Sequence, residues 1–335
     1  MRPVRYLFLL LLFIGALYSC NKDLNVNADW KDVTVVYCLL DQTDDTTFLK
    51  ITKAFLGEGD ALMFSKIPDS SNYPDKLEVS LKEFLVNETN DTIFIQSYSC
   101  DTITIHNKRK GDSVFYYPDQ LMYYTTAKLN QNYIYELNIM NKKSGKAITA
   151  KTALVHDFEI SKPMSVASFP PNQMFEVKWS PAKNGKRYQL LVRFYYYESL
   201  KNKPDSLYPR SMDWIVFNNV KAIDDQSTLP FDLYYPGSAF YAVVGTNIKP
   251  DTLVHHRVAH HCYFIFTVAA SELNTYMEVT EPSLSLVQEK PSFTNIVNGI
   301  GLFSSRFIKL SDSLGISDLT KAELKVNVHT SGLGF

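Results

Sequence analysis

The chain has 335 residues, and its 34 basic and 35 acidic side chains nearly cancel, so it lacks the electropositive surface with which proteins bind nucleic acid. Tyrosine and phenylalanine occur 21 times each but glycine only 13 times, which favours β-strands over glycine-rich nucleotide-binding loops. This length is natural for two domains of ordinary size. We therefore expect a mainly β protein with two domains and no nucleic-acid partner.

The first residues have the composition of an export signal. Two arginines precede an apolar run, Tyr6 to Ala16, which is far shorter than the roughly 20 residues that a membrane-spanning helix needs. The run ends in Leu17-Tyr18-Ser19-Cys20, which resembles a bacterial lipobox. The resemblance implies that residues 1–19 are a signal peptide, that Cys20 is acylated on its thiol and amine, and that residues 20–30 form a lipidated tether. The alternative is ordinary signal cleavage that leaves Cys20 as a structural thiol.

Lys22 and Asp23 follow this cysteine and resemble the Lys-acidic export signal that places lipoproteins of Bacteroidota on the outer face of the outer membrane. The likeness implies a lipid-anchored protein of the outer membrane that faces the cell surface. The start of the chain thus predicts an address and leaves the activity open.

Residues 31–155 alternate short runs of β-branched and aromatic residues with clusters of turn-forming residues. Such a pattern, with almost no helical period, is typical of an antiparallel β-sandwich. Asp41 to Asp45 predicts the turn of a first hairpin, and Asn141 to Lys146 predicts a later one. The expected strands are 33–40, 47–54, 77–86, 92–96, 102–106, 114–117, 121–129, 133–140 and 147–154.

Three prolines between residues 156 and 171 place a domain boundary there, and residues 156–305 form the expected second domain. Trp179 on one strand and Tyr188 at the start of the next resemble the front half of a fibronectin type III or immunoglobulin-like sandwich. Its further strands are expected at 190–197, 214–217, 240–246 and 254–268. A short helix is expected at 271–279 with Ser271 as its cap, and residues 306–335 are expected to be a C-terminal extension.

The cysteines other than Cys20 are Cys38, Cys100 and Cys262, and they have no metal-binding spacing and no CxxC motif. An oxidising envelope would permit a disulfide between Cys38 and Cys100. The apolar neighbours of these residues favour three buried thiols instead.

A distinctive motif lies near the C-terminus: Asn295-Ile296-x-Asn298-Gly299-x-Gly301-x-Phe303. Together with the lipobox, the opening strand Val33–Leu40 and the Trp179/Tyr188 pair, it resembles an uncharacterised family of Bacteroidota outer-membrane lipoproteins. Genes of that family often lie beside those of TonB-dependent receptors, so the resemblance implies such a receptor as a partner. The glycines themselves allow a close approach between backbones, which suits a closing strand.

Four histidines and a thiol lie within eight residues, from His255 to Cys262. Imidazole is a common ligand of zinc, copper and nickel, so His255, His256, His260 and His261 are candidate metal ligands. In a strand, adjacent histidines point to opposite faces, whereas a hairpin that turns at residues 257–259 would bring the two pairs together. The other interpretation is a polar turn that leads into a buried strand at Cys262. No acidic residue lies nearby to orient an imidazole.

Catalytic motifs are absent from the sequence: it has no G-x-S-x-G, HExxH, P-loop or G-x-G-x-x-G. The paired carboxylates Asp44-Asp45 and Asp224-Asp225 occur in turn-like contexts. Tyrosines recur in clusters at 116–117, 123–124, 195–197 and 234–235, and half of each cluster would face solvent on a strand. Exposed tyrosine suits contact with a glycan or a peptide, while cross-strand aromatic pairs also stabilise sheets.

Asp followed by Ser or Thr recurs along the chain and resembles the O-glycosylation acceptor of Bacteroidota envelope proteins. Asx-type turns that lead into strands are the alternative explanation. The acceptors implied are Thr46, Thr92, Thr102, Ser113, Ser206, Thr252 and Ser313.

The sequence as a whole predicts a non-enzymatic, lipid-anchored binding or accessory module for an outer-membrane receptor, with no cofactor and with a glycan or peptide as its ligand. The alternative is an envelope hydrolase that acts on glycans or peptides, because the two carboxylates of a glycosidase come from distant strands and leave no local motif.

Overall fold

The computed structural model describes residues 33–54, 71–87, 89–106, 119–223, 228–281 and 292–335, which form a mainly β protein with three sheets and short helices. The first strands are β1 (Val33–Leu40), β2 (Thr47–Ala54), β3 (Glu78–Val86), β4 (Thr92–Ser99), β5 (Asp101–Ile105), β6 (Gln120–Thr125), β7 (Ile134–Asn141) and β8 (Lys146–Ala153). The others are β9 (Ile160–Lys162), β10 (Val166–Ala167), β11 (Met174–Trp179), β12 (Arg187–Leu200), β13 (Lys203–Lys221), β14 (Phe231–Pro236), β15 (Val254–Ala269), β16 (Gly299–Leu310) and β17 (Leu314–Ile316). The helices are α4 (Ser238–Asn247), α5 (Ser271–Thr280), α6 (Asp318–Val326) and the 3-10 turn η1 (Ser331–Leu333).

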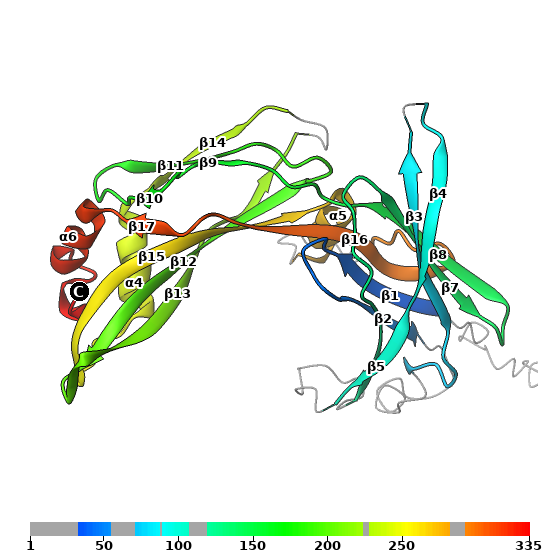
Figure 1. Ribbon diagram of the computed structural model, residues 1–335, viewed down its shortest axis with the longest axis horizontal. Helices are drawn as coiled ribbons and strands as arrows, with labels where there is room; N and C mark the ends of the chain where they lie inside the picture. The colour runs from blue at the N-terminus through cyan, green and yellow to red at the C-terminus, as the bar shows by residue number, and fades with distance from the viewer. Residues whose placement is uncertain (1–32, 55–70, 88, 107–118, 224–227, 282–291) are drawn as a thin grey trace, which may run out of the picture.

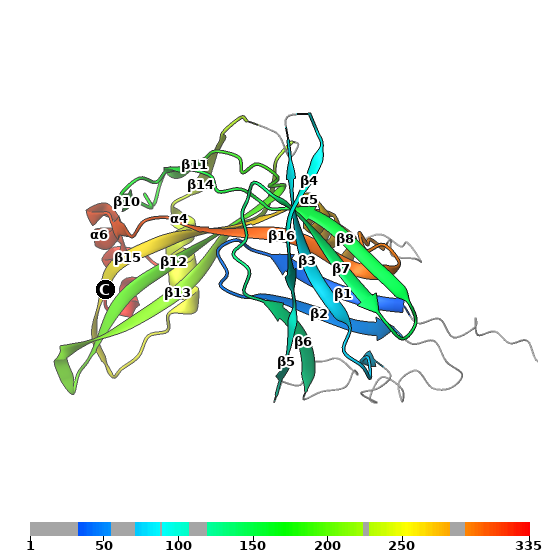
Figure 2. The same cartoon turned by 45° about the vertical axis from the view of Figure 1, so that its right-hand side comes forward.

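Figure 1 shows two lobes joined by the long strand β16. The N-terminal lobe contains β1 to β8, and the C-terminal lobe contains β9 to β15 with β17, α4 and α6. The largest sheet passes through both lobes in the order β10-β17-β15-β16-β1-β2-β6-β5, and β12 pairs with β15 and with β13. The two smaller sheets are β4-β3-β7-β8 and β14-β11-β9. Figure 2 shows β3, β7 and β8 lying across β1 and β2.

Strand β16 changes partner halfway along its length. Residues 299–305 pair in parallel with β1, and residues 306–310 pair antiparallel with β15. Gly301 has a φ of 116°, and a Cβ atom there would lie 2.0 Å from the carbonyl oxygen of Val36, so the close approach of the two strands requires glycine. Asn295 supports the same strand, because its Oδ1 accepts from the Phe303 N–H at 3.0 Å and its Nδ2 donates to the Phe303 carbonyl oxygen at 2.6 Å. The C-terminal motif is therefore the contact between the last long strand and the first.

The core of the N-terminal lobe is mainly aliphatic. Val36 of β1, Leu81 of β3 and Ile139 of β7 are at most 1% exposed and belong to one cluster. Burial of such side chains contributes about 1.5–3 kcal/mol each. The cluster ends along the chain at Leu154, and the neighbouring Val155 already belongs to the other core.

The core of the C-terminal lobe is built from aromatic rings. Trp179 is fully buried and stacks on Phe231 with the ring centroids 4.6 Å apart and an interplanar angle of 10°. Tyr188 and Phe266 also contact this indole, at 5.8 Å and 5.1 Å. The hydroxyl of Tyr188 accepts a hydrogen bond from the Ala182 N–H at 2.8 Å, which satisfies its one polar atom. The inward Trp179 and its contact with Tyr188 agree with the sequence expectation.

Local patterns predicted many of the strands. The expected runs 33–40, 47–54 and 77–86 correspond to β1, β2 and β3, and the expected hairpins join β1 to β2 and β7 to β8. The expected helix is α5, although it begins after an Ala270 cap that makes no side-chain hydrogen bond. The expected strand 114–117 lies outside the described residues.

The expected strand at 240–246 is wrong, because this segment is the helix α4. Its β-branched and aromatic residues favour a strand, yet Phe240, Tyr241 and Val244 form one fully buried helical face against the C-terminal core. Gly245 allows the chain end to pass closely, since a Cβ atom there would lie 2.3 Å from the His329 carbonyl oxygen. Tertiary packing has overridden the local preference.

The chain after residue 305, expected as an extension, contributes directly to the fold. The second half of β16 lies there, and Phe307, Leu314, Ile316 and Leu324 are buried in the C-terminal core. The buried guanidinium of Arg257 donates to Glu198 Oε2 at 3.0 Å and also bonds to the Leu333 carbonyl oxygen. These contacts hold the end of the chain against β15.

The three cysteines in the described part of the chain are free thiols. Cys38 and Cys262 are buried and Cys100 is half-buried. Burial raises the pKa of the Cys262 thiol to about 12 and that of Cys100 to about 11. The expectation of buried, unreactive thiols agrees with this arrangement.

Candidate functional site

The outward face of β12 and β15 carries aromatic side chains. Alternation along β12 buries Phe194 and Tyr196 in the core and turns Tyr195 and Tyr197 to the opposite face. On β15 the same alternation buries Cys262 and leaves Tyr263 half-buried on the outward side. The core thus fixes which rings point outward.

A β-bulge at His260 adds a further ring to this face. Tyr195 pairs with His261, whereas Tyr196 pairs with Ala259, so His260 has no opposite residue on β12. The extra residue allows two successive imidazoles to lie together: their ring centroids are 4.6 Å apart, and their Nδ1 atoms are in contact. A regular strand would have sent them to opposite faces.

Five rings then form one connected group, which we call the aromatic patch. Tyr195 stacks on His261 at 4.6 Å with an interplanar angle of 7°, and Tyr197 meets His260 edge to face at 5.0 Å. Tyr263 stands perpendicular to Tyr195 and His261, at 5.9 Å and 5.3 Å. These contacts hold the rings in fixed orientations, which lowers the entropy that a ligand would have to remove on binding.

An ion pair lies at the border of the aromatic patch. Arg193 Nε and a terminal nitrogen of the same guanidinium donate to the two carboxylate oxygens of Asp213, at 2.7 Å and 2.8 Å. The guanidinium also hydrogen-bonds to Tyr195. These hydrogen bonds, led by the one to Arg193, hold the pKa of the Asp213 carboxyl below its usual value. The pair is about 40% exposed, so planar polar groups face solvent beside the rings.

The electrostatics of the patch favour neutral imidazole at His261. Burial, and secondarily the charge of His260, lower the pKa of His261 below its usual value. A neutral ring keeps one nitrogen as an acceptor and the other as a donor. Two tyrosine hydroxyls, an imidazole and the ion pair therefore present both donors and acceptors.

His255 and His256, the other two histidines of the cluster, lie at the opposite end of the strand. The expected hairpin turn at 257–259 is wrong, because β15 runs without interruption from Val254 to Ala269. His256 Nδ1 lies 2.8 Å from the hydroxyl of Ser199 instead. Four residues of strand separate His256 from His260, which is roughly 13 Å at about 3.3 Å per residue.

The four imidazoles therefore do not meet. Within the described ranges, no group of three or more His, Cys, Asp or Glu side chains could hold a metal ion. Metal binding by the adjacent pair His260 and His261 stays a prediction.

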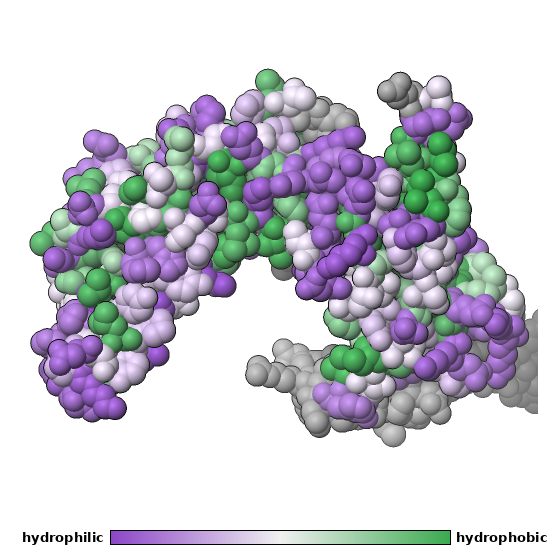
Figure 3. All heavy atoms as spheres, in the orientation of Figure 1, coloured by the Kyte–Doolittle hydropathy of each residue, from purple (hydrophilic) through white to green (hydrophobic). Residues whose placement is uncertain are grey.

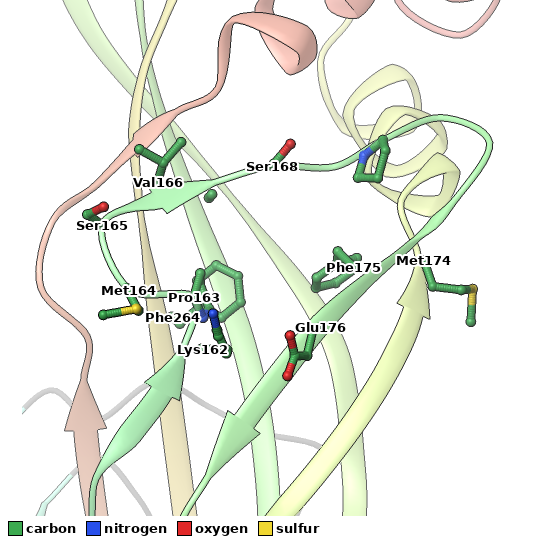
Figure 4. Close-up of a pocket in the computed structure, with 12 residues that line it drawn as sticks. Lys162, Pro163, Met164, Ser165, Val166, Ser168, Met174, Phe175, Glu176 and Phe264 are labelled. Carbon is green, nitrogen blue, oxygen red and sulfur yellow. The ribbon is translucent and has the colours of Figure 1, made fainter.

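A second concave feature lies between the two sheets of the C-terminal lobe (Figure 4). This cavity of about 390 Å³ is lined by Phe175 and Phe264 on its inner side. Met164 and Val166, on the connection around β10, are 73% and 50% exposed at its rim. Its mostly apolar wall, with Lys162 and Glu176 nearby in Figure 4, suits an apolar side chain and offers few groups that would orient a polar ligand.

The residues of the expected lipid anchor and export signal, Cys20, Lys22 and Asp23, lie outside the described residues, as does Ser113. Of the other expected glycosylation sites, Thr46 and Thr102 are half-buried. Thr92, Ser206, Thr252 and Ser313 are exposed, so an attached glycan would meet no packing obstacle at these four positions. Modification itself stays a prediction.

Sequence reasoning singled out the tyrosine run and the histidine run separately and missed Arg193, Asp213 and Tyr263. Only the pairing of β12 with β13 and β15 brings these groups together. An alternating pattern around residue 193 indicates the outward face, but the sequence alone does not indicate its neighbours across the sheet.

No helix in the described part of the chain is long and apolar enough to span a membrane. No protein-family model matches the chain, and no curated protein matches it. Among solved structures, the chain is similar to one described as "Crystal structure of CBD12 from CALX1.2", with 9% identity and a TM-score of 0.14 over 82% of this chain and all of that one. A likeness this weak leaves the function to be argued from the site itself.

Proposed function

We propose that this protein is a non-catalytic, lipid-anchored outer-membrane protein that binds carbohydrate on the aromatic patch and acts as an accessory module to a TonB-dependent receptor. The observation that carries the ligand class is the connected group of five rings beside a bidentate Arg–Asp pair. Sugars present apolar C–H faces that pack on rings, and hydroxyls that need planar donors and acceptors. The patch supplies both.

The absence of catalytic motifs supports a binding role, and the rival function is an envelope hydrolase acting on glycans or peptides. The only carboxylate that we place at the border of the patch, Asp213, is engaged by both nitrogens of Arg193 and has a lowered pKa. A general acid needs a raised pKa. This arrangement favours retention of a sugar over its cleavage.

The membrane address rests on Cys20 and the Lys22-Asp23 pair. Several acyl chains on one residue give stable anchoring, because each buried CH₂ contributes about 0.8 kcal/mol. We expect Cys20→Ala to release the protein from membranes without changing its circular dichroism spectrum. If the variant still sediments with outer membranes, the lipid anchor is wrong.

We also propose that each lobe is a β-sandwich domain and that the second is immunoglobulin-like. The support is that β14-β11-β9 and the β12, β15 strands contribute to one core, with Trp179 central to it. An experimental structure of the second lobe that lacks two facing sheets would overturn this assignment.

Glycan binding is tested with the Cys20→Ala protein, which keeps every described residue. Isothermal titration calorimetry with soluble maltoheptaose, xylohexaose, laminarihexaose and mannohexaose should give saturable heat for at least one sugar. Tyr195→Ala or Tyr263→Ala should weaken that binding by about tenfold or more, since one lost ring contact is worth on the order of 1 kcal/mol or more. Tyr234→Ala is the matched control, because Tyr234 is 56% exposed on β14, outside the patch.

Three outcomes count against the proposal. Equal losses in Tyr195→Ala and Tyr234→Ala would remove the patch as the site, and silence with every sugar would remove the ligand class. Release of shorter sugars during the titrations would favour the hydrolase. For the receptor, affinity purification of the native lipoprotein from solubilised outer membranes should recover a TonB-dependent receptor, and recovery of none contradicts that part.

A further inference from the structure

The N-terminal lobe ends in an exposed edge strand, β4. It is the last strand of the sheet β4-β3-β7-β8, and among the described residues it pairs with β3 alone. Figures 1 and 2 show β3 and β4 projecting beyond the body of the lobe as a two-stranded arm. One side of the β4 backbone therefore faces away from the rest of the lobe.

Strand β4 exposes apolar side chains on both of its faces. Ile93, Phe94 and Ile95 are 46%, 54% and 40% exposed, and every residue of the strand except Tyr98 is exposed. Figure 3 shows hydrophobic residues gathered on the visible side of this arm. A solvent-facing ribbon normally carries polar residues on the face away from the core, so this composition needs an explanation.

The strand also lacks the usual guards against edge pairing. Natural edge strands are protected by lysine, proline or inward charges, and the sequence Thr92-Ile-Phe-Ile-Gln-Ser-Tyr-Ser99 has none of these. The one protective feature is a register irregularity opposite Glu83 and Phe84. An added strand can still pair with the free backbone groups on either side of it.

Charge at the two ends of β4 indicates what kind of strand can pair there. Asp91 precedes it and Asp101 follows it, and both are exposed. Hydrogen bonds from Thr89 and then Asn87 hold the pKa of Asp91 below its usual value, so this end stays anionic.

A second copy of the chain is disfavoured by these charges. Antiparallel pairing of two β4 strands about their centre would bring Asp91 of each copy next to Asp101 of the other. Like charges in close register destabilise strand pairing. A strand with basic ends would instead gain an ion pair at each end.

We propose that β4 is a docking strand that binds, by β-strand addition, an extended segment of a partner protein in which apolar residues alternate along the strand and a basic residue lies at each end. Backbone hydrogen bonds supply affinity, Ile93 and Phe94 contact side chains on the two faces, and Asp91 and Asp101 set the register. This site lies in the other lobe from the aromatic patch and does not depend on it.

The probe is a fluorescein-labelled eight-residue peptide in which isoleucine and valine alternate with threonine between two terminal lysines. Fluorescence anisotropy with the Cys20→Ala protein should show saturable binding. The same peptide with alternate backbone nitrogens methylated keeps its side chains but cannot pair, and it should not bind. Replacing the terminal lysines with glutamates should weaken binding by about tenfold or more, because two attractive ion pairs become repulsive.

Two variants place the binding on β4. Phe94→Lys should abolish it, while Leu253→Lys, at a 69% exposed position of the C-terminal lobe, should leave it unchanged. Asp101→Lys alters only one exposed end and should shift preference toward a peptide with glutamate at the matching end.

The proposal is overturned if the unmodified peptide does not bind, if the methylated peptide binds equally well, or if Asp101→Lys leaves the preference unchanged. It is also overturned if sedimentation velocity shows a dimer that Phe94→Lys dissociates, because the occupant would then be a second copy.

Discussion

The two lobes expose apolar groups in different ways. In the C-terminal lobe the outward rings stand on β12 and β15, and each of these strands is paired on both sides, so only side chains are available to a ligand. In the N-terminal lobe β4 is paired on one side among the described residues, so its backbone is available as well. Side-chain surfaces suit ligands such as sugars, whereas a backbone edge suits another strand.

The same contrast extends to the cores. The C-terminal core of interlocking rings fixes the orientation of β12 and β15, and hence of the aromatic patch on their other face. The N-terminal core of aliphatic residues ends below the arm formed by β3 and β4. Strand β16 belongs to both lobes, since Phe303 is buried in the first core and Phe307 in the second. The molecule thus combines two recognition surfaces on one shared strand.

Breaking that shared strand should have the largest effect. Gly301→Val would place a Cβ atom about as close as a covalent contact to the Val36 carbonyl oxygen, at a positive φ that valine does not adopt. We expect a loss of more than about 4 kcal/mol in the free energy of unfolding, measured with urea. Gly315→Val is the control, because a Cβ atom there has no neighbour within 4 Å, and we expect it to change stability by less than about 0.5 kcal/mol. Equal losses in the two variants would contradict the account of β16.

A change in one core tests whether the lobes are coupled through β16. Trp179→Ala removes the ring on which Phe231 stacks and should cost about 3–5 kcal/mol. Hydrogen exchange should show the largest loss of protection in β11, β12 and β15. The matched variant Leu137→Ala, buried in the N-terminal core, should cost about 2–5 kcal/mol and expose β3 and β7 first. Identical exchange patterns from the two variants would mean that the lobes unfold as a single unit.

The smallest expected effect is a pH dependence from two histidines. Burial, as the leading cause, lowers the pKa of His156 and of His261 below the usual value of about 6.5. The folded state therefore favours the neutral rings, and their contribution to stability is present above pH ~6.5 and is lost as pH falls through the unfolded pKa toward the folded one. Between pH 7.5 and 5.5 the wild-type protein should lose more stability than the double variant His156→Gln, His261→Gln. An equal or larger loss in the double variant would contradict this assignment.

Short-range patterns in the sequence predicted much of this molecule, and long-range pairings account for what they missed. The alternation in residues 33–40 and 134–141 specifies strands because each one buries every second side chain. The helix α4 was missed because its strand-favouring residues are stabilised by burial of Phe240 and Tyr241, which local preference does not reveal. The candidate site depends on a bulge at His260 and on strand partners about 70 residues apart along the chain, as with Tyr195 and His261. Neither feature leaves a local signal.

The glycines of the C-terminal motif show the reverse case. Gly299 and Gly301 already indicated a close backbone approach, and the structure identifies their neighbours as Thr34 and Val36 of β1. The residue types were therefore sufficient to predict the kind of contact, while the partner strand, more than 250 residues earlier in the chain, required the fold.

The central claim is that the aromatic patch binds carbohydrate, and the chain's seven histidines allow it to be tested at the site. In ¹³C-labelled protein each imidazole gives its own signals, which can be assigned by single His→Gln variants. Titration with the hexasaccharide or heptasaccharide that gives the largest calorimetric heat should shift the signals of His260 and His261 and leave those of His106, His156 and His329 in place. Unchanged signals from His260 and His261 at a saturating sugar concentration would contradict the account.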